Sequence, residues 1–271
     1  MNGIKKRQTV SFLAGLACFF LLWQLGAWLT GSAIILPGPL PVVKKLASLL
    51  KTEKFLPALA SSTFRLLLGL AVSVPLGTLA GLVSAIDKRA DAFLRPFFSV
   101  IAATPVMSVI LIAFLAFGSE KTPVFTAFLM VFPVIAANTA AGVKAVDPGL
   151  AELFKVYGLG GKEKLRYLYI PSLLPYLAAG LHSGLSLGWK VVVAAEVLVQ
   201  PLSALGTGMQ MAKAQLETPE LFAWTAATVI AAALSDILLK LLSLLLVRKK
   251  KSFRGGTAVF SQVRKEGPSH S

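Results

Sequence analysis

Long apolar runs separated by short charged segments make up most of the chain. Six runs reach the roughly 20 residues that an α-helix needs to cross about 30 Å of hydrocarbon. They cover approximately residues 10–30, 64–85, 96–117, 123–141, 176–198 and 221–247. Only Gly118–Thr122 separates the third run from the fourth, so we expect a tight hairpin there. The pattern predicts an all-α membrane protein with about six transmembrane helices.

The composition supports a membrane protein and excludes an ordinary soluble domain. Apolar residues make up 56% of the 271 residues and charged residues only 14%, whereas soluble domains carry about 25% charged residues. The first apolar run follows three basic residues, as a secretory signal peptide would. It continues for about 20 residues without a small-residue cleavage site, so we interpret it as an uncleaved first span.

The formal net charge of +15 is explained by membrane topology. Positively charged residues favour the cytoplasmic side of a membrane. With a cytoplasmic N-terminus, 18 of the 27 Lys and Arg residues fall on that side and two lie within spans. The others are Lys44, Lys45, Lys51, Lys54, Arg65, Lys121 and Lys213. We therefore expect both termini in the cytoplasm and contact with membrane lipid, and no nucleic-acid partner.

This topology divides the chain into three parts. Residues 1–9 are expected to form a cytoplasmic N-terminus, residues 10–247 the transmembrane domain, and residues 248–271 a basic, flexible cytoplasmic tail. After Pro37, apolar residues at helical spacing alternate with lysines. This predicts a short amphipathic helix on the outer membrane surface.

Small residues recur every four positions in two of the spans. They are Gly69, Ser73, Gly77 and Gly81 in the second span and Gly180, Gly184 and Gly188 in the fifth. Such stripes allow helix backbones to approach closely in a membrane. We expect tight helix packing along both, within the subunit or across a dimer.

The loop of residues 142–175, between the fourth and fifth spans, carries most of the local signals. Asp147 is placed to cap a short helix that has a proline at its first position, and Gly158 is placed to end it. A second short helix is expected from about Lys162 to Pro171. A cytoplasmic helix–Gly–helix hairpin of this kind is suited to binding by another protein.

The same loop resembles the coupling loop of permease subunits of ATP-binding-cassette (ABC) importers. The family pattern is Glu-Ala-Ala, three residues, Gly, nine residues, then Ile-x-Leu-Pro. The matching residues are Glu152, Gly158 and Pro171, with Leu168 and Ile170 as conservative replacements and Leu153 and Phe154 at the two Ala positions. Likeness along nearly the whole chain points to the branch with nitrate, sulfonate, taurine and bicarbonate permeases, including Leu173-Leu174-Pro175, Trp189 and Ala195-Glu196.

The resemblance implies the permease subunit of an ABC importer, a multi-pass protein of a prokaryotic cytoplasmic (inner) membrane. It would form the path for a small solute, for example an anion such as sulfonate, taurine or nitrate. The implied partners are a second permease subunit, as a homodimer, two cytoplasmic ABC ATPases and an extracytoplasmic solute-binding protein. The residues implied to couple transport to the ATPase are Glu152, Gly158, Gly161, Lys162, Leu165 and Pro171.

We expect no catalytic site in this chain. Gly158 to Lys162 looks like part of a phosphate-binding loop, but Val156 and Glu163 stand where that loop needs a Gly and a Ser or Thr. There is no Ser/His/Asp arrangement, and two distant His residues cannot make a metal site. No cofactor is expected on this chain, and ATP and Mg²⁺ would be used by the partner ATPase.

Ionisable residues inside spans are costly, by at least about 2.5 kcal/mol, so each is a candidate functional residue. Lys190 could offer its charge to an anionic solute, pair with an acid on a neighbouring helix, or reach toward the outer headgroups. Glu196 lies on another helix face, near the outer end, where a gate or a structural acceptor fits better. These two and Trp189 are the candidate residues of the solute pathway. Asp236 and Lys240 are expected to pair within one helix.

The sequence leaves two functions from other classes as alternatives. An ATP-independent secondary transporter or channel usually needs broken helices or a line of membrane acids, and the sequence has few of either. A non-transporting membrane scaffold needs only the hydrophobic bundle. Neither explains the spacing of Glu152, Gly158 and Pro171.

Overall fold

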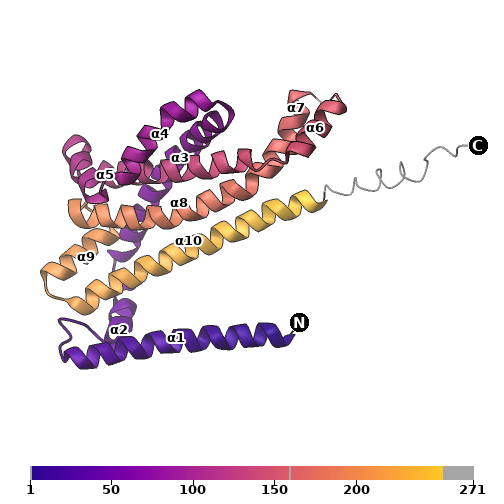
Figure 1. The fold of residues 1–271 in the computed structure, drawn as a ribbon. Helices are drawn as coiled ribbons and strands as arrows, with labels where there is room; N and C mark the ends of the chain where they lie inside the picture. Colours follow the sequence, from indigo (N-terminus) through magenta and orange to yellow (C-terminus); the bar gives the residue numbers. More distant parts are fainter. Residues whose placement is uncertain (1, 159, 253–271) are drawn as a thin grey trace, which may run out of the picture. The chain divides into compact units, whose positions relative to one another are not determined.

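The computed structural model describes residues 2–158 and 160–252, and it is built from helices (Figure 1). They are α1 (Asn2–Thr30), α2 (Pro39–Leu49), α3 (Phe55–Ile86), α4 (Lys88–Ala103), α5 (Val106–Lys144), α6 (Pro148–Val156), α7 (Gly161–Lys164), the π-helix η1 (Leu165–Tyr169), α8 (Ile170–Val199), α9 (Leu205–Ala214) and α10 (Thr218–Ser252). No strand occurs within these two ranges. The predicted all-α fold is confirmed.

Five stretches of helix in the described ranges are long and apolar enough to cross a membrane. They are Thr9–Thr30, Phe55–Ile86, Val106–Lys144, Gly161–Val199 and Thr218–Ser243. Each overlaps a predicted span, although the second begins nine residues earlier than the predicted 64–85. The predicted number of six spans is not confirmed, because the third, 96–117, is not a single helix.

The third predicted span is interrupted by a proline. Helix α4 ends at Ala103 and α5 begins at Val106. Thr104, between them, is extended, with φ −74° and ψ 127°. A residue before proline is disfavoured in the helical conformation, and Pro105 itself has no N–H to donate. A hydropathy pattern does not register this break, since all of these residues are compatible with an apolar run.

In place of the hairpin predicted at Gly118–Thr122, the helix changes direction at Gly118 alone. Gly118 has φ 74° and ψ 178°, so α5 consists of two helical parts that meet there. The rings of Phe117 and Phe125 lie 4.8 Å apart between centroids across this corner. Thr122 Oγ1 donates a hydrogen bond to the Gly118 carbonyl oxygen at 2.7 Å. A positive φ of this size suits glycine because it has no Cβ.

The two small-residue stripes pack against the part of α5 that follows Gly118. A Cβ on Gly81 of α3 would lie 2.4 Å from the Ala136 carbonyl oxygen. A Cβ on Gly184 of α8 would lie 2.8 Å from Val131 Cγ1. Larger side chains at these positions would push the helices apart. Packing within the chain, one of the two predicted uses, is therefore observed.

The predicted amphipathic helix is present as α2, and its place on the outer membrane surface stays a prediction. Its apolar residues Val42 and Leu49 are buried against the protein. On its polar side, Lys45 Nζ lies 3.0 Å from a Glu220 carboxylate oxygen and 3.3 Å from one of Glu217. The hydrogen bond to Glu220, followed by that to Glu217, raises the pKa of Lys45. These bonds tie α2 to the beginning of α10.

The C-terminal part of α10, from Ala233, belongs to a separate compact unit. Within it, Lys240 Nζ lies 2.7 Å from Asp236 Oδ2, so the predicted pair is confirmed. Helix α10 continues to Ser252. The rest of the predicted tail, residues 253–271, lies outside the described residues.

Candidate functional site

The segment from α6 to η1, residues 148–169, begins and turns where the sequence predicts. The Asp147 carboxylate accepts a hydrogen bond from Gly149 N at 2.8 Å. It therefore caps the start of α6, at which Pro148 is the first residue. Gly158 has φ +66°, which glycine adopts without the steric penalty of other residues. This segment is called the α6–η1 segment below.

Pro171 does not end a helix, so that prediction is wrong. The helix that begins as α7 at Gly161 passes through the π-helix η1 and continues as α8. A proline inside an α-helix clashes with the carbonyl four residues before it and removes one hydrogen bond. In the wider turn of η1, Ile170 N instead bonds to Leu165 O, five residues back. Because this turn directly precedes Pro171, the proline ring is accommodated.

The predicted coupling residues lie on an exposed surface. Glu152, Gly158, Gly161, Lys162 and Leu165 are exposed and Pro171 is half-buried. No residue of α6 whose side chain is described is buried, and Val156 and Tyr157 next to Gly158 are 80% and 71% exposed. Leu168 is the buried anchor of the segment. The α6–η1 segment thus presents apolar side chains that the chain itself does not cover.

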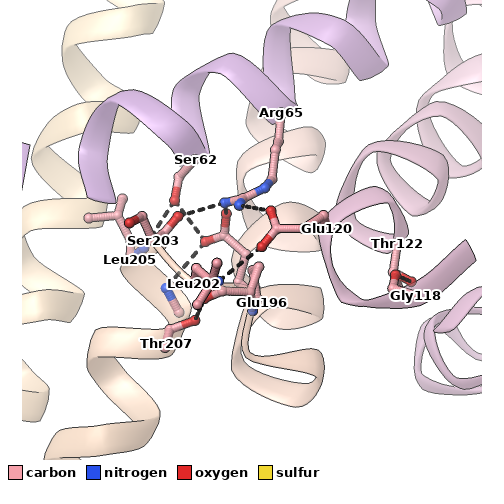
Figure 2. A network of polar contacts seen from close by, with 12 residues as sticks. Ser62, Arg65, Gly118, Glu120, Thr122, Glu196, Leu202, Ser203, Leu205 and Thr207 are labelled. Atoms are coloured by element: carbon pink, nitrogen blue, oxygen red, sulfur yellow. Dashed lines mark hydrogen bonds and ion pairs between the residues drawn. The ribbon is translucent and has the colours of Figure 1, made fainter. Parts of the chain in front are cut away.

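A network of charged residues lies near the other end of α8 (Figure 2). Arg65 of α3 stands between Glu196 of α8 and Glu120 of α5. Its Nη1 lies 3.1 Å from Glu196 Oε1 and its Nη2 lies 2.6 Å from Glu120 Oε2. Nη1 also donates to the Ser203 carbonyl oxygen at 2.9 Å. Only 8% of the Arg65 side chain is exposed, so these acceptors replace the water that a buried cation lacks.

The Glu196 carboxylate is fully buried and its oxygens are occupied. Besides Arg65, it accepts hydrogen bonds from Ser62 Oγ at 2.8 Å and from Gly206 N at 3.2 Å. Ser62 Oγ in turn accepts from Leu205 N at 3.0 Å. A Cβ on Gly206 would lie 2.5 Å from Glu196 Cβ, so glycine is needed for this close approach. In this conformation the Glu196 carboxylate accepts hydrogen bonds from the protein and has no exposed surface.

The Glu120 carboxylate is held differently. Its second oxygen, Oε1, accepts a hydrogen bond from Leu202 N at 3.0 Å, while half of its side chain, 52%, is exposed. It lies two residues beyond the Gly118 corner. Glu120 therefore joins that corner to Arg65 and to the connection between α8 and α9.

A groove of about 770 Å³ opens beside Arg65 and Glu120, between α3 and α5. Its other lining residues are mostly apolar and include Phe64, Phe125 and Phe128. The charged residues therefore line one part of a groove whose walls are otherwise compatible with hydrocarbon.

The structure does not bring Lys190 to this network. Lys190 is exposed, and no ion pair or hydrogen bond of its side chain occurs among the described residues. Trp189 is buried, 2% exposed, on the same stretch of α8 as Gly188, where a Cβ would lie 2.5 Å from Leu66 Cδ1. The candidate pathway residues thus have three different environments, and only Lys190 presents a charge outward.

Sequence reasoning missed most of this network. Arg65 was assigned to the outer side of the membrane, and Ser62 and Glu120 were not singled out. Helix α3 begins at Phe55, so Arg65 lies inside a helix and its charge is met by two carboxylates. The available signal was Arg65 itself, a single basic residue flanked by Phe64 and Leu66.

Residues 73–252 match the family of binding-protein-dependent transport system inner membrane components. The match covers more than half of the chain. The chain belongs to this family. It is therefore a permease subunit of an ABC importer, a multi-pass protein of the inner membrane. Permeases of this family work with ATPase and solute-binding partners, so these two predicted classes of partner are supported.

Curated relatives agree with the predicted branch of the family. The taurine transport system permease protein TauC of Escherichia coli is 28% identical over 243 residues, covering 87% of this chain and 88% of TauC. SsuC of Bacillus subtilis, named for aliphatic sulfonates transport, is 26% identical over 254 residues, covering 92% of both chains. The crystal structure of an amino acid ABC transporter with histidines has the same fold, with a TM-score of 0.54, 21% identity and coverage of 72% of this chain and 95% of that one.

Proposed function

We propose that this permease works as a homodimer with two separate ATPase subunits and imports a small anion. The observation that carries the ATPase part is the α6–η1 segment, which is turned by Gly158 and displays exposed Val156 and Tyr157. Apolar surface of this kind, rimmed by charges, suits a protein partner. ATP and Mg²⁺ are bound by the partner, and this chain supplies no cofactor site.

The coupling residues have separate roles in this proposal. Leu165 and the neighbouring apolar side chains fill the groove of the ATPase, and Lys162 and Glu152 set the register at its rim. Gly158 allows the turn between α6 and α7. Closure of the ATPases then moves the segment, and continuous helix from Gly161 to Val199 transmits the movement into the membrane.

The solute class rests on Lys190 and on the relatives. Taurine and aliphatic sulfonates, the solutes in the names of TauC and SsuC, carry a sulfonate anion. Lys190 presents the cation that such an anion needs in a membrane pathway. Lys190→Gln should raise the KM for the anion about tenfold, the loss of one charged contact. Lys213→Gln, at another exposed lysine, should leave the KM unchanged.

In the membrane orientation that we propose, both termini and the α6–η1 segment lie in the cytoplasm, and the charged network lies at the extracytoplasmic end. Single cysteines in a Cys18→Ser background test it. A cysteine at Lys121, near the network, should react with a membrane-impermeant maleimide in intact cells. A cysteine at Lys144, before α6, should react only after the cells are broken. The reverse pattern would overturn the orientation.

Purification of the full chain from its native membranes in mild detergent tests the whole proposal. An ATPase subunit should co-purify in equal amount, and the complex in proteoliposomes should take up labelled taurine, methanesulfonate or nitrate when ATP is supplied. Recovery of the chain without an ATPase would contradict the proposal. It would favour an ATP-independent transporter.

Gly158→Leu tests the coupling role in the same complex. It should leave ATPase activity present and abolish uptake, because a bulky residue disfavours the left-handed turn. Gly31→Leu is the matched control, since Gly31 also has a positive φ, +60°, and a Cβ there meets no atom within 4 Å. Unchanged uptake by Gly158→Leu, or equal loss in both variants, would remove the coupling role.

A further inference from the structure

Arg65 has two carboxylate partners that are held with unequal strength. Glu196 has no exposed surface in its side chain, and Arg65, Ser62 and Gly206 all donate hydrogen bonds to it. Glu120 is 52% exposed and, among the described residues, is bonded to Arg65 and the backbone of Leu202. One partner is therefore enclosed in the protein, while the other can be reached by water.

The two bonds differ in what would follow if they opened. Opening the Arg65–Glu196 pair would leave a buried carboxylate without its cation, which is strongly unfavourable. Opening the Arg65–Glu120 pair would leave Arg65 with Glu196 and with the Ser203 carbonyl. Glu120 would move into water, where a carboxylate is stable. Of the two pairs, only the one with Glu120 can open without stranding a charge.

The surroundings of Glu120 allow it to move. Gly118 provides a corner with a positive φ of 74°, at which a Cβ would meet no atom within 4 Å. The groove of about 770 Å³, which Glu120 and Phe125 both line, leaves space next to the corner into which it can move. Because Leu202 N is bonded to Glu120, movement of the corner also releases Leu202, in the connection between α8 and α9.

We propose that Glu120 is a positioning residue of the transport cycle whose ion pair with Arg65 opens and closes in each turnover. When closed, it holds the Gly118 corner and Leu202 next to α3. When open, it lets the corner move away at the extracytoplasmic end, while Ser203 and Leu205 stay bonded to α3. The pair of Arg65 with Glu196 stays formed throughout and keeps α3 and α8 together. This inference rests on the proposed function for its cycle and its orientation.

Glu120→Gln is the decisive variant, because it removes the charge and keeps an acceptor for Leu202 N. In the purified complex with its ATPases, the basal rate of ATP hydrolysis per assembled complex should rise about two- to fivefold, as expected when a half-exposed ion pair no longer restrains one state. A purely structural role predicts the opposite, a rate that is unchanged or lower. Glu120→Asp, which restores the charge, should return the rate toward that of the unaltered complex.

Glu217→Gln is the matched control. Its side chain is 51% exposed, and its cation, Lys45, keeps a second carboxylate, Glu220. It should leave the basal rate unchanged. A rate in Glu120→Gln equal to that of the unaltered complex, or an equal rise in both variants, would overturn the role of Glu120. Absence of ATP hydrolysis in the unaltered complex would instead refute the proposed function.

A second measurement needs no ATPase. Thr122 is fully buried two residues beyond Glu120, in the corner that Glu120 holds, so Thr122→Cys in a Cys18→Ser background should react slowly with a water-soluble maleimide. Adding Glu120→Gln should accelerate the reaction about two- to fivefold, and adding Glu217→Gln should not. Equal reaction rates with and without Glu120→Gln would also overturn the inference.

Discussion

The charged network at the Glu196 end of α8 and the α6–η1 segment, which precedes the other end, differ in which residues contact their side chains. At the Glu196 end, hydrogen bonds join residues 131 and 134 positions apart in the sequence, and the carboxylate is fully buried. At the other end, the bond that shapes α6 joins Asp147 to a residue two positions away. There, Val156 and Tyr157 remain largely exposed.

This difference separates the residues that stabilise the fold from those available to a partner. Long-range bonds at the network are made only when α3, α5 and α8 have come together, so their loss weakens the folded state. The α6–η1 segment is shaped locally and leaves its apolar side chains uncovered. Substitutions at the first end should mainly lower stability, and substitutions at the second should mainly weaken a complex.

Loss of Glu196 should have the largest effect on stability. Glu196→Ala leaves Arg65 with one carboxylate and leaves Ser62 Oγ and Gly206 N without an acceptor. Breaking a buried pair in this way costs about 3–5 kcal/mol, which thermal unfolding in detergent would detect as a large fall in midpoint. Glu217→Ala, at a half-exposed pair, should cost at most about 1 kcal/mol. Similar midpoints for the two variants would contradict the contrast between the two ends.

The next largest loss of stability is expected when a larger side chain replaces a glycine of a small-residue stripe. A Cβ on Gly77 would lie 2.8 Å from Ile135 Cβ and 2.9 Å from the Phe132 carbonyl oxygen, so Gly77→Val should destabilise by about 1–3 kcal/mol. Gly15→Val in α1, where a Cβ meets no atom within 4 Å, serves as the control. If both variants unfold at the same temperature, close packing of α3 on α5 does not stabilise the bundle.

A charge in the α6–η1 segment should leave stability nearly unchanged. Val156→Asp affects an exposed side chain, so the unfolding free energy should stay within about 0.5 kcal/mol. The same variant should lose the ATPase during affinity purification, because a carboxylate would be buried in the contact. Val43→Asp, at an exposed valine of α2, should keep the ATPase. Retention of the ATPase by Val156→Asp would remove the segment from the interface.

The smallest effect on stability is expected at Asp91 of α4, whose carboxylate accepts hydrogen bonds and is partly exposed to water. Hydrogen bonds from Ser84 and then from Arg95 hold the pKa of Asp91 below its ordinary value of 3.8. A lowered folded-state pKa stabilises the protein above the unfolded-state pKa, and the contribution is lost as the pH falls through the folded-state value. Ser84→Ala should therefore lower the unfolding temperature near neutral pH and lose that effect below about pH 4. A difference that does not vary with pH would exclude this cause.

The sequence was informative wherever one segment determined its own structure. Asp147 and Gly158 set the cap and the turn of the α6–η1 segment through bonds and backbone angles that involve only near neighbours. The small-residue stripes likewise predicted close packing, because their spacing is a property of each helix alone. Which helix each stripe would meet was not predictable, because the facing surface belongs to other segments: mostly α5, and at Gly188 also Leu66 of α3.

The network required information that no single segment carries. Arg65 could be recognised as buried only if Glu120 and Glu196, on two other helices, were known to reach it. A positive charge in isolation favours water, which is why Arg65 was assigned to the outside. The π-helix η1 was missed for a related reason. Pro171 alone signals the end of a helix, and the turn that accommodates it depends on the preceding residues.

The π-helix also changes how this protein can tolerate insertions and deletions. A π turn contains one residue more than the α turn it replaces. Removing one residue from Leu165–Tyr169 should therefore contract that turn and leave Gly184 and Gly188 facing the same neighbours. Removing one residue from the regular part of α8 would rotate everything beyond it by about 100° and bring other side chains into the core. Natural length variation among homologous chains should accordingly be tolerated at η1 and rare along the rest of α8.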